Sequence, residues 1–359
     1  MTNNQITYKR LGEYIREVNV RNRELKVNLS QGICNDKYFQ NPKQVADNPE
    51  THKIVRTGQF AYNRATTRNG DKLSIALRQG PDCTVSAAYQ VFEVSRPDLL
   101  LPEYLMMWFK RPEFDRLALF YSHGSAHEFF EWESMCDVQL PVPSIERQRE
   151  IVSEYETLTH RIRLNEQMIE KLEATAQALY HKTFVACIDK QNLPQGTLGD
   201  LVTPQKGRNI VREECIEGNE PVIAGGKTPS CFHNQSNTGA PVVTISASGA
   251  NAGYVGLHFN KVWAADCSYI DVDIFPYISY IYVLLSMSQE RLYSMQEGTG
   301  QPHIYPRHIM SLSITLPSND AIRMFHEKVT PFFRKINLKQ QENIKLTELQ
   351  SLLLAKMGQ

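Results

Sequence analysis

Polar loops that combine cations, amides and glycines are the segments of this sequence best suited to chemistry with another molecule. Arginine hydrogen-bonds guanine, asparagine and glutamine hydrogen-bond adenine, and glycine lets a backbone approach a ligand closely. One such loop, residues 62–72, reads YNRATTRNGDK and carries three cations and two asparagines. This composition predicts contacts with a nucleic acid at Asn63, Arg64, Arg68 and Lys72.

A second group of such loops lies between residues 205 and 303. Its segments read KGRN at 206–209, GGK at 225–227, HNQ at 233–235 and TGQPH at 299–303. Taken alone, each of these residues is more typical of a solvated loop, but their presence as a set in both halves of the chain favours a nucleic-acid-binding face. The candidate contact residues in this half are Lys206, Arg208, Asn209, Lys227, Asn234, Gln301 and His303.

Motifs for catalysis are missing from the sequence. Residues 224–228, AGGKT, end like a phosphate-binding loop, but Pro221 stands where that motif requires its first glycine. An Asn/Asp-Pro-Pro-aromatic motif for adenine methylation, a GxSxG elbow and an HExxH pair do not occur. The ten histidines are scattered, without the spacing of a metal-ligand set. The sequence therefore predicts no catalytic residue, no metal site and no cofactor bound by this chain.

The overall composition excludes several classes of protein. With 39 basic and 39 acidic residues, the chain cannot hold a polyanion by bulk charge alone, so partners would have to supply cations. Seven cysteines without a CxxC motif predict a reducing, cytoplasmic environment and no disulfide framework. We expect neither a signal peptide nor a membrane span, because no apolar run approaches about 18 residues. A length of 359 residues predicts two or three domains.

Two long helices are predicted to position the recognition loops. Their apolar residues recur at alternating steps of three and four, the pattern of a coiled-coil seam. Ser144 is the expected N-cap of the first helix, and Pro331 is expected to kink the second helix or delay its start. The alternative for each is an ordinary amphipathic helix on a globular core. The expected seam residues are Ile151, Tyr155, Leu158, Ile162, Asn165, Ile169, Leu172, Ala176 and Leu179 in the first helix, and Ile322, Phe325, Val329, Phe332, Ile336, Lys339, Asn343, Leu346, Gln350 and Leu353 in the second.

The segments outside these helices are rich in glycine, proline and short β-branched runs, which predicts mostly β domains. We expect an α+β fold with four parts: a first recognition domain at 1–143, a helix at 144–190, a second recognition domain at 191–317 and a helix at 318–359. Expected strands lie within 85–94, 241–245 and 269–274, and an expected short helix covers 102–109.

The two halves repeat. Residues 11–14, LGEY, are echoed by 198–201, LGDL, and residues 140–143, LPVP, are echoed by 316–319, LPSN. Further matches keep the same order, at offsets between 174 and 187 positions. The arrangement of globule, helix, globule and helix predicts pseudo-twofold symmetry, the geometry with which proteins contact two half-sites on DNA.

This arrangement resembles the specificity subunits of type I restriction-modification systems over essentially the whole chain. Residues 140–152, LPVPSIERQREIV, resemble the family's entry into its central helix, and residues 298–304, GTGQPHI, resemble a stretch near the end of its target-recognition domains. Residues 198–201 resemble the usual domain opening. Residues 124–128, GSAHE, lack the glutamine of that stretch, and residues 317–320, PSND, lack the Glu-Gln signature of the helix entry.

The resemblance implies a non-catalytic subunit whose two target-recognition domains each contact one half of a split site on double-stranded DNA. It implies that the helices pack as an antiparallel coiled coil that acts as a spacer. It also implies docking of two methyltransferase subunits, which bind S-adenosylmethionine, and of restriction subunits, which use ATP and magnesium. Two alternatives remain: a specificity subunit of a related modification system outside type I, and a coiled-coil scaffold that binds proteins and not DNA.

Overall fold

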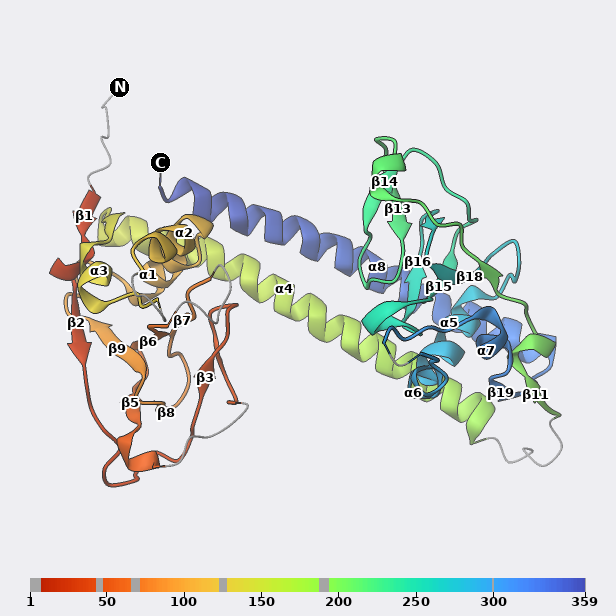
Figure 1. The fold of residues 1–359 in the computed structure, drawn as a ribbon, viewed down its shortest axis with the longest axis horizontal. Coiled ribbons are helices and arrows are strands. Elements are labelled where there is room, and N and C mark those ends of the chain that lie inside the picture. Colours follow the sequence, from red (N-terminus) through yellow and green to blue (C-terminus); the bar gives the residue numbers. More distant parts are fainter. Residues whose placement is uncertain are drawn as a thin grey trace. The chain divides into compact units, whose positions relative to one another are not determined.

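The computed structural model describes residues 8–42, 48–65, 72–122, 128–186, 194–298 and 300–358. The chain divides into two compact units: unit 1 is Met1–Ile162 with Ile344–Gln359, and unit 2 is Arg163–Asn343 (Figure 1). Both units mix helices with sheets, as the α+β prediction requires. Each long helix passes from one unit into the other.

Unit 1 is built on a four-stranded antiparallel sheet with the strand order β2-β9-β6-β7. Phe60 and Phe92 are cross-strand neighbours whose rings stack 4.8 Å apart, and both are fully buried. Helix α1 places the buried ring of Phe109 edge-on against both. These aromatic contacts form part of the core of unit 1. The elements are β2 (Ile15–Val18), β6 (Phe60–Asn63), β7 (Ile75–Leu77), β9 (Tyr89–Val94), α1 (Pro102–Phe109), α2 (Pro112–Phe120) and α3 (Trp132–Asp137).

The remaining described strands of unit 1 form three two-stranded ladders. One of them, β1 with β10, pairs residues near the two ends of the predicted first domain. The 3-10 turn η1 (Leu11–Glu13) follows β1 directly, and its Leu11 amide donates to the Val138 carbonyl at 2.8 Å. The ladders are β1 (Tyr8–Arg10) with β10 (Gln139–Pro141), β3 (Gly32–Ile33) with β4 (Phe39–Gln40), and β5 (Lys53–Val55) with β8 (Cys83–Val85).

Unit 2 also contains a four-stranded antiparallel sheet, with the order β12-β18-β15-β16. A smaller sheet, β14-β13-β17, contains the parallel pair β13-β17, and β11 pairs with β19. The 3-10 turn η5 (Leu198–Asp200) follows β11, and its Leu198 amide donates to the Leu312 carbonyl at 2.9 Å. The strands are β11 (Gln195–Thr197), β12 (Gln205–Lys206), β13 (Glu220–Ile223), β14 (Cys231–His233), β15 (Val242–Ser246), β16 (Val255–His258), β17 (Trp263–Ala264), β18 (Cys267–Asp271) and β19 (Ser313–Thr315), and the short helices are α5 (Ile278–Met287), α6 (Gln289–Ser294) and α7 (Pro306–Met310).

The two predicted long helices are present. Helix α4 (Ile145–Tyr180) continues into one π-helical turn (His181–Val185), and the Ser144 hydroxyl accepts a hydrogen bond from the Arg147 amide at 3.3 Å, as an N-cap does. Helix α8 (Asn319–Lys356) runs through Pro331. The expectation that Pro331 delays the start of this helix is therefore wrong. Because residues on both sides of the proline are buried in the core of unit 2, their packing holds the helix despite the missing N–H.

The seam residues predicted from the heptad pattern are buried or half-buried, while most of their neighbours on the two helices are exposed. In unit 2, the buried amide of Asn165 donates to Asn343 Oδ1 at 2.7 Å. In unit 1, Gln350 Nε2 donates to the Thr159 hydroxyl at 2.7 Å. One seam residue is misplaced: Phe332 is half-buried, and Phe333 beside it is 3% exposed. Within the described residues, no helix has the length and apolar character needed to cross a bilayer.

Candidate nucleic-acid interface

Trp263 organises the loop of unit 2 that follows β12. Its indole Nε1 donates to the Arg208 carbonyl at 2.8 Å, and the Arg208 guanidinium lies 6.0 Å from the indole ring. The Arg208 amide donates to the Ala264 carbonyl at 2.9 Å. These contacts fix the backbone of the loop and leave the side chains of Lys206, Arg208 and Asn209 exposed.

A glycine makes this close approach possible. A Cβ on Gly207 would lie 2.3 Å from the Ala265 carbonyl oxygen, so any larger residue would push the loop away from β17. We conclude that the position of the three exposed side chains depends on Gly207 as well as on Trp263.

Three further loops of unit 2 are joined by backbone contacts. A Cβ on Gly225 would lie 2.7 Å from the Ser248 carbonyl oxygen, so residues 224–227 pack against the loop after β15. The Gly249 amide donates to the Pro302 carbonyl at 3.0 Å, and Ser248 forms a β-bridge with His303. The structure thus brings the predicted segments at 225–227 and 300–303 to the same loop, residues 246–253.

Aromatic rings support the polar residues of these loops. The ammonium of Lys227 lies 5.4 Å from the ring centroid of Tyr254. The ring of His303 stacks on that of Tyr305 at 6.0 Å and 12°, and the guanidinium of Arg307 lies 4.8 Å from the same tyrosine. Tyr305 is 37% exposed, so part of its ring is open to a ligand. Rings of this kind can stack on unpaired or splayed bases.

The remaining candidates of unit 2 lie on two different segments. Asn234 is exposed and follows His233, whose buried ring meets Trp263 edge-on at 5.1 Å. Gln301 is exposed, in the loop that begins at Gly298 with a φ of +102°. Asn234 therefore belongs to the group of residues around Trp263, and Gln301 belongs to the group around Tyr305.

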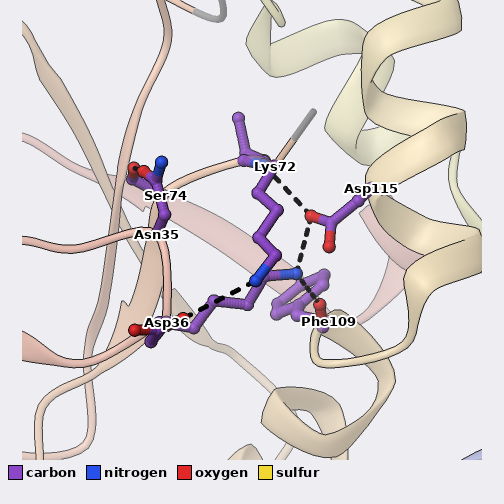
Figure 2. A network of polar contacts seen from close by, with 8 residues as sticks. Asn35, Asp36, Lys72, Ser74, Phe109 and Asp115 are labelled. Carbon is purple, nitrogen blue, oxygen red and sulfur yellow. Dashed lines mark hydrogen bonds and ion pairs between the residues drawn. The ribbon is translucent and has the colours of Figure 1, made fainter. Parts of the chain in front are cut away.

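The loop of unit 1 is arranged differently, because each described cation there faces a carboxylate. Arg64 Nη2 lies 3.5 Å from Glu131 Oε1, and its guanidinium lies 5.5 Å from the Phe129 ring. Lys72 Nζ lies 3.6 Å from Asp36 Oδ1 (Figure 2). Asn63, at the end of β6, accepts a hydrogen bond from the Ala65 amide at 3.2 Å. The fourth candidate, Arg68, lies outside the described residues.

Charge distinguishes the two groups of candidates. Within the part of the chain that the structure describes, Lys206, Arg208 and Lys227 form no ion pair with a carboxylate, and all three are exposed. Unpaired, exposed cations beside hydrogen-bonding side chains suit a polyanion. The described residues contain no group of three or more His, Cys, Asp or Glu side chains that could hold a metal ion.

Sequence reasoning missed the supporting residues of this interface. Trp263, Tyr254, Tyr305 and Arg307 were not candidates, although they order the loops that carry the candidates. A usable signal was present at Tyr305 and Arg307, where an aromatic and a cation follow TGQPH within four residues. Trp263 lies 55 positions from Arg208, and no local pattern connects the two.

Comparisons with known proteins agree with this architecture, although no protein-family model matches the chain. The type I restriction enzyme MjaIX specificity subunit of Methanocaldococcus jannaschii is 22% identical over 302 residues, which are 72% of this chain and 69% of the relative. The crystal structure of a type I restriction-modification S subunit from M. genitalium aligns over 100% of this chain and 98% of its own, with a TM-score of 0.69 and 15% identity.

The HsdS subunit from Thermoanaerobacter tengcongensis aligns over 98% of this chain and 96% of its own, at 17% identity, but with a TM-score of 0.37, too low to support a common fold by itself. The chain therefore has the fold of a type I restriction-modification S subunit and is similar in sequence to a curated specificity subunit, which confirms the resemblance predicted from its motifs.

Proposed function

We propose that this chain is the sequence-specific DNA-recognition subunit of a type I restriction-modification complex and that it acts in the cytoplasm. The observation that carries the proposal is the set of unpaired, exposed cations on unit 2, next to the exposed Gln301 and the Tyr305 ring. Cations can bind backbone phosphates and fix the position of the protein, while amide and guanidinium groups hydrogen-bond base edges. The similarity to specificity subunits supports the same role.

Each unit contacts one half of a split site in this proposal, because the units repeat one structural plan. Two local features support the repeat. In unit 1, a β-ladder near the domain ends is followed by the turn at Leu11–Glu13, and a Cβ on Gly12 would meet Cys136. In unit 2, a ladder is followed by the turn at Leu198–Asp200, and a Cβ on Gly199 would meet Met310. The four-stranded sheets also share their pattern of antiparallel neighbours.

Helices α4 and α8 form an antiparallel coiled coil that acts as the spacer between the half-sites. Support comes from contacts inside each unit: Asn165 near the middle of α4 bonds Asn343, and Thr159 earlier in α4 bonds Gln350 later in α8. The residue that comes earlier in α4 thus bonds the residue that comes later in α8, as expected for two antiparallel helices. A partly buried Asn–Asn pair in a mostly apolar seam also fixes the register of two helices, at some cost in stability.

Two methyltransferase subunits, with restriction subunits in the full complex, are the proposed protein partners. The helices offer an apolar surface for docking, because Leu349 and Leu352 of α8 are exposed in unit 1. With Thr157 and Leu158 of α4 they line a groove of about 420 Å³. The partners would supply S-adenosylmethionine and ATP chemistry, together with cations that this neutral chain lacks. If the chain instead belongs to a related modification system outside type I, it would recognise DNA in the same way but bind other protein partners.

The chain itself is proposed to be non-catalytic. Purified chain incubated with S-adenosylmethionine and DNA should transfer no methyl group, and methyltransferase subunits alone should not methylate a specific site. Together they should methylate adenine at one split sequence, measured by incorporation of labelled methyl groups into duplexes. Methyl transfer by the chain alone would contradict the proposal. If the chain is instead a scaffold that binds proteins and not DNA, the mixture of chain and methyltransferase subunits should not methylate a specific sequence.

Single substitutions should separate base contacts from phosphate contacts on unit 2. If Gln301 hydrogen-bonds an adenine with both groups of its amide, Gln301→Ala should weaken binding of the cognate duplex by about 1–3 kcal/mol and leave non-specific binding unchanged. If Arg208 contacts a phosphate, Arg208→Ala should weaken binding to all duplexes and reduce the slope of log affinity against log salt by about 1.

The matched control for these substitutions is Gln167→Ala, which removes an exposed glutamine of α4 in the same unit. The measurement is fluorescence anisotropy of cognate and scrambled duplexes across a salt series, with the chain assembled with methyltransferase. Equal affinities for Gln301→Ala, Arg208→Ala and the control would remove both residues from the interface.

A further inference from the structure

A pocket of about 430 Å³ in unit 1 is lined in part by Lys72 and Asp36, whose ion pair Figure 2 shows. It is bounded by the segment before β4 and by helix α2. Four cations line it together with two carboxylates, so the pocket wall has an excess of positive charge. The charged lining residues are Lys37, Lys72, Lys110, Arg116, Asp36 and Asp115.

Three of the four cations form ion pairs with carboxylates. The buried ammonium of Lys37 lies 2.7 Å from Asp115 Oδ1 and also donates to the Phe109 carbonyl. The same Asp115 oxygen also accepts a hydrogen bond from the Leu73 amide at 3.1 Å. Lys72 faces Asp36, and Arg116 lies 3.4 Å from Glu113. The Lys37–Asp115 pair is therefore a structural pair that shapes the wall of the pocket.

Lys110 is the exception. Its ammonium lies 4.9 Å from the ring centroid of Tyr155, and within the described residues it forms no ion pair. Burial lowers the pKa of Lys110, the charge of Lys37 lowers it further, and Glu156 acts in the opposite sense. A half-buried cation with another cation nearby is stabilised by an anion that enters the pocket.

We propose that this pocket binds a phosphate group, with Lys110 at its inner side and Lys72 at its rim. Lys72 also ends the loop at residues 62–72, so a backbone phosphate of the target duplex is the source that the geometry favours. That part of the inference rests on the proposed DNA-binding function. A free phosphate or a nucleotide carries the same chemistry and is the other possible source.

Lys110→Met tests the pocket, because methionine keeps an apolar stem against Tyr155 and removes the charge. Lys9→Met is the matched control, since Lys9 is an exposed lysine of β1 in the same unit and does not line the pocket. Lys72→Met is a second variant at a half-exposed position, so it gives an answer even if Lys110→Met fails to fold.

The first arm uses the full chain and inorganic phosphate. A ligand that binds only the native state raises the melting temperature, so phosphate should stabilise wild type relative to chloride at equal ionic strength. The apparent dissociation constant for phosphate should rise about tenfold in Lys110→Met and stay unchanged in Lys9→Met. The proposed phosphate site would be overturned if phosphate stabilised wild type and Lys110→Met equally. It would also be overturned if phosphate did not stabilise wild type.

The second arm uses the chain assembled with methyltransferase and a cognate duplex. If the bound phosphate belongs to DNA, Lys110→Met should reduce the slope of log affinity against log salt by about 0.9, and Lys9→Met should not. If Lys110→Met loses stabilisation by phosphate but keeps the wild-type slope of log affinity against log salt, the bound phosphate does not belong to DNA. The ligand is then a free phosphate or a nucleotide. A wild-type complex that binds no DNA would refute the proposed function, while the first arm still decides the pocket.

Discussion

One heptad added to each long helix should lengthen the preferred gap between the two half-sites by up to about three base pairs. Seven residues extend a helix by roughly 10 Å at 1.5 Å per residue, and duplex DNA advances about 3.4 Å per base pair. The insertion points are after Ile162 in α4 and after Asn343 in α8, where the chain passes between its two units. Both units then keep their own residues, including the Asn165–Asn343 hydrogen bond of unit 2.

The same insertion should also lower affinity. Three base pairs rotate the second half-site by roughly 100°, since a turn of the duplex takes about 10 base pairs. The coil or the DNA must absorb this rotation, and the deformation costs free energy without changing either half-site. The measurement is methylation of a duplex series in which the gap grows one base pair at a time.

The control carries the heptad in α4 alone, which makes the helices unequal in length between the units. This variant should lose site-specific methylation at every gap, because the two seams no longer match. An unchanged optimum gap in a folded, active double-insertion chain would refute the spacer and leave the helices as a docking surface.

The long helices were the most predictable part of the fold, because their pattern is local. Helix α1, at Pro102–Phe109, also matches its expected bounds, since a proline at its first position fixes its start. The buried and half-buried face of each helix was predicted almost residue by residue. The burial of Phe333 was not predicted, because a heptad pattern assumes a narrow contact with one other helix. This part of α8 packs instead into the wider core of unit 2.

The expected strands are present with shifted bounds. The apolar run at 85–94 contains the end of β8, a turn and then β9 (Tyr89–Val94), and the run at 269–274 ends its strand at Asp271. Strand order could not be predicted, because pairing between β6 and β9 joins residues about 30 positions apart and leaves no local signal. The division at 1–143, 144–190, 191–317 and 318–359 stays a proposal.

The candidate site was predicted only in part, for the same reason. Composition indicated the loops, but not that Trp263 and Tyr305 order them or that Arg64 and Lys72 face carboxylates. The Lys37–Asp115 pair joins residues 78 positions apart, and both are of a type that usually lies on the surface. Contacts between residues far apart in the sequence cannot be predicted from a pattern of neighbouring residues.

Exchange of the first recognition domain should replace one half of the methylated sequence and leave the other half intact. Residues 1–143 are replaced by the equivalent segment of a relative with a different target. The graft is practicable because β1 pairs with β10, so the described ends of the segment lie side by side. If each unit contacts its own half-site, only the first unit's half can change, and the gap should stay the same.

The design must respect one set of contacts outside the segment. Val152 of α4 and Met357 of α8 pack into the core of unit 1, and the Tyr8 hydroxyl donates to the Gly358 carbonyl at 2.9 Å. A second graft therefore also carries the donor's residues equivalent to 344–359. The matched control returns the original residues 1–143 through the same cloning junction, and its methylated sequence should be that of the natural chain.

The most direct test of the account is the adenine-methylation motif of cells that produce each chain with its methyltransferase, mapped by single-molecule sequencing of their DNA. Without this chain, the split motif should be absent from the genome. With the natural chain it should be present, and with the grafted chain one half should change while the second half and the gap are kept. A motif that persists without the chain, or one in which the graft alters both halves or neither, would contradict a specificity subunit with two separate recognition units.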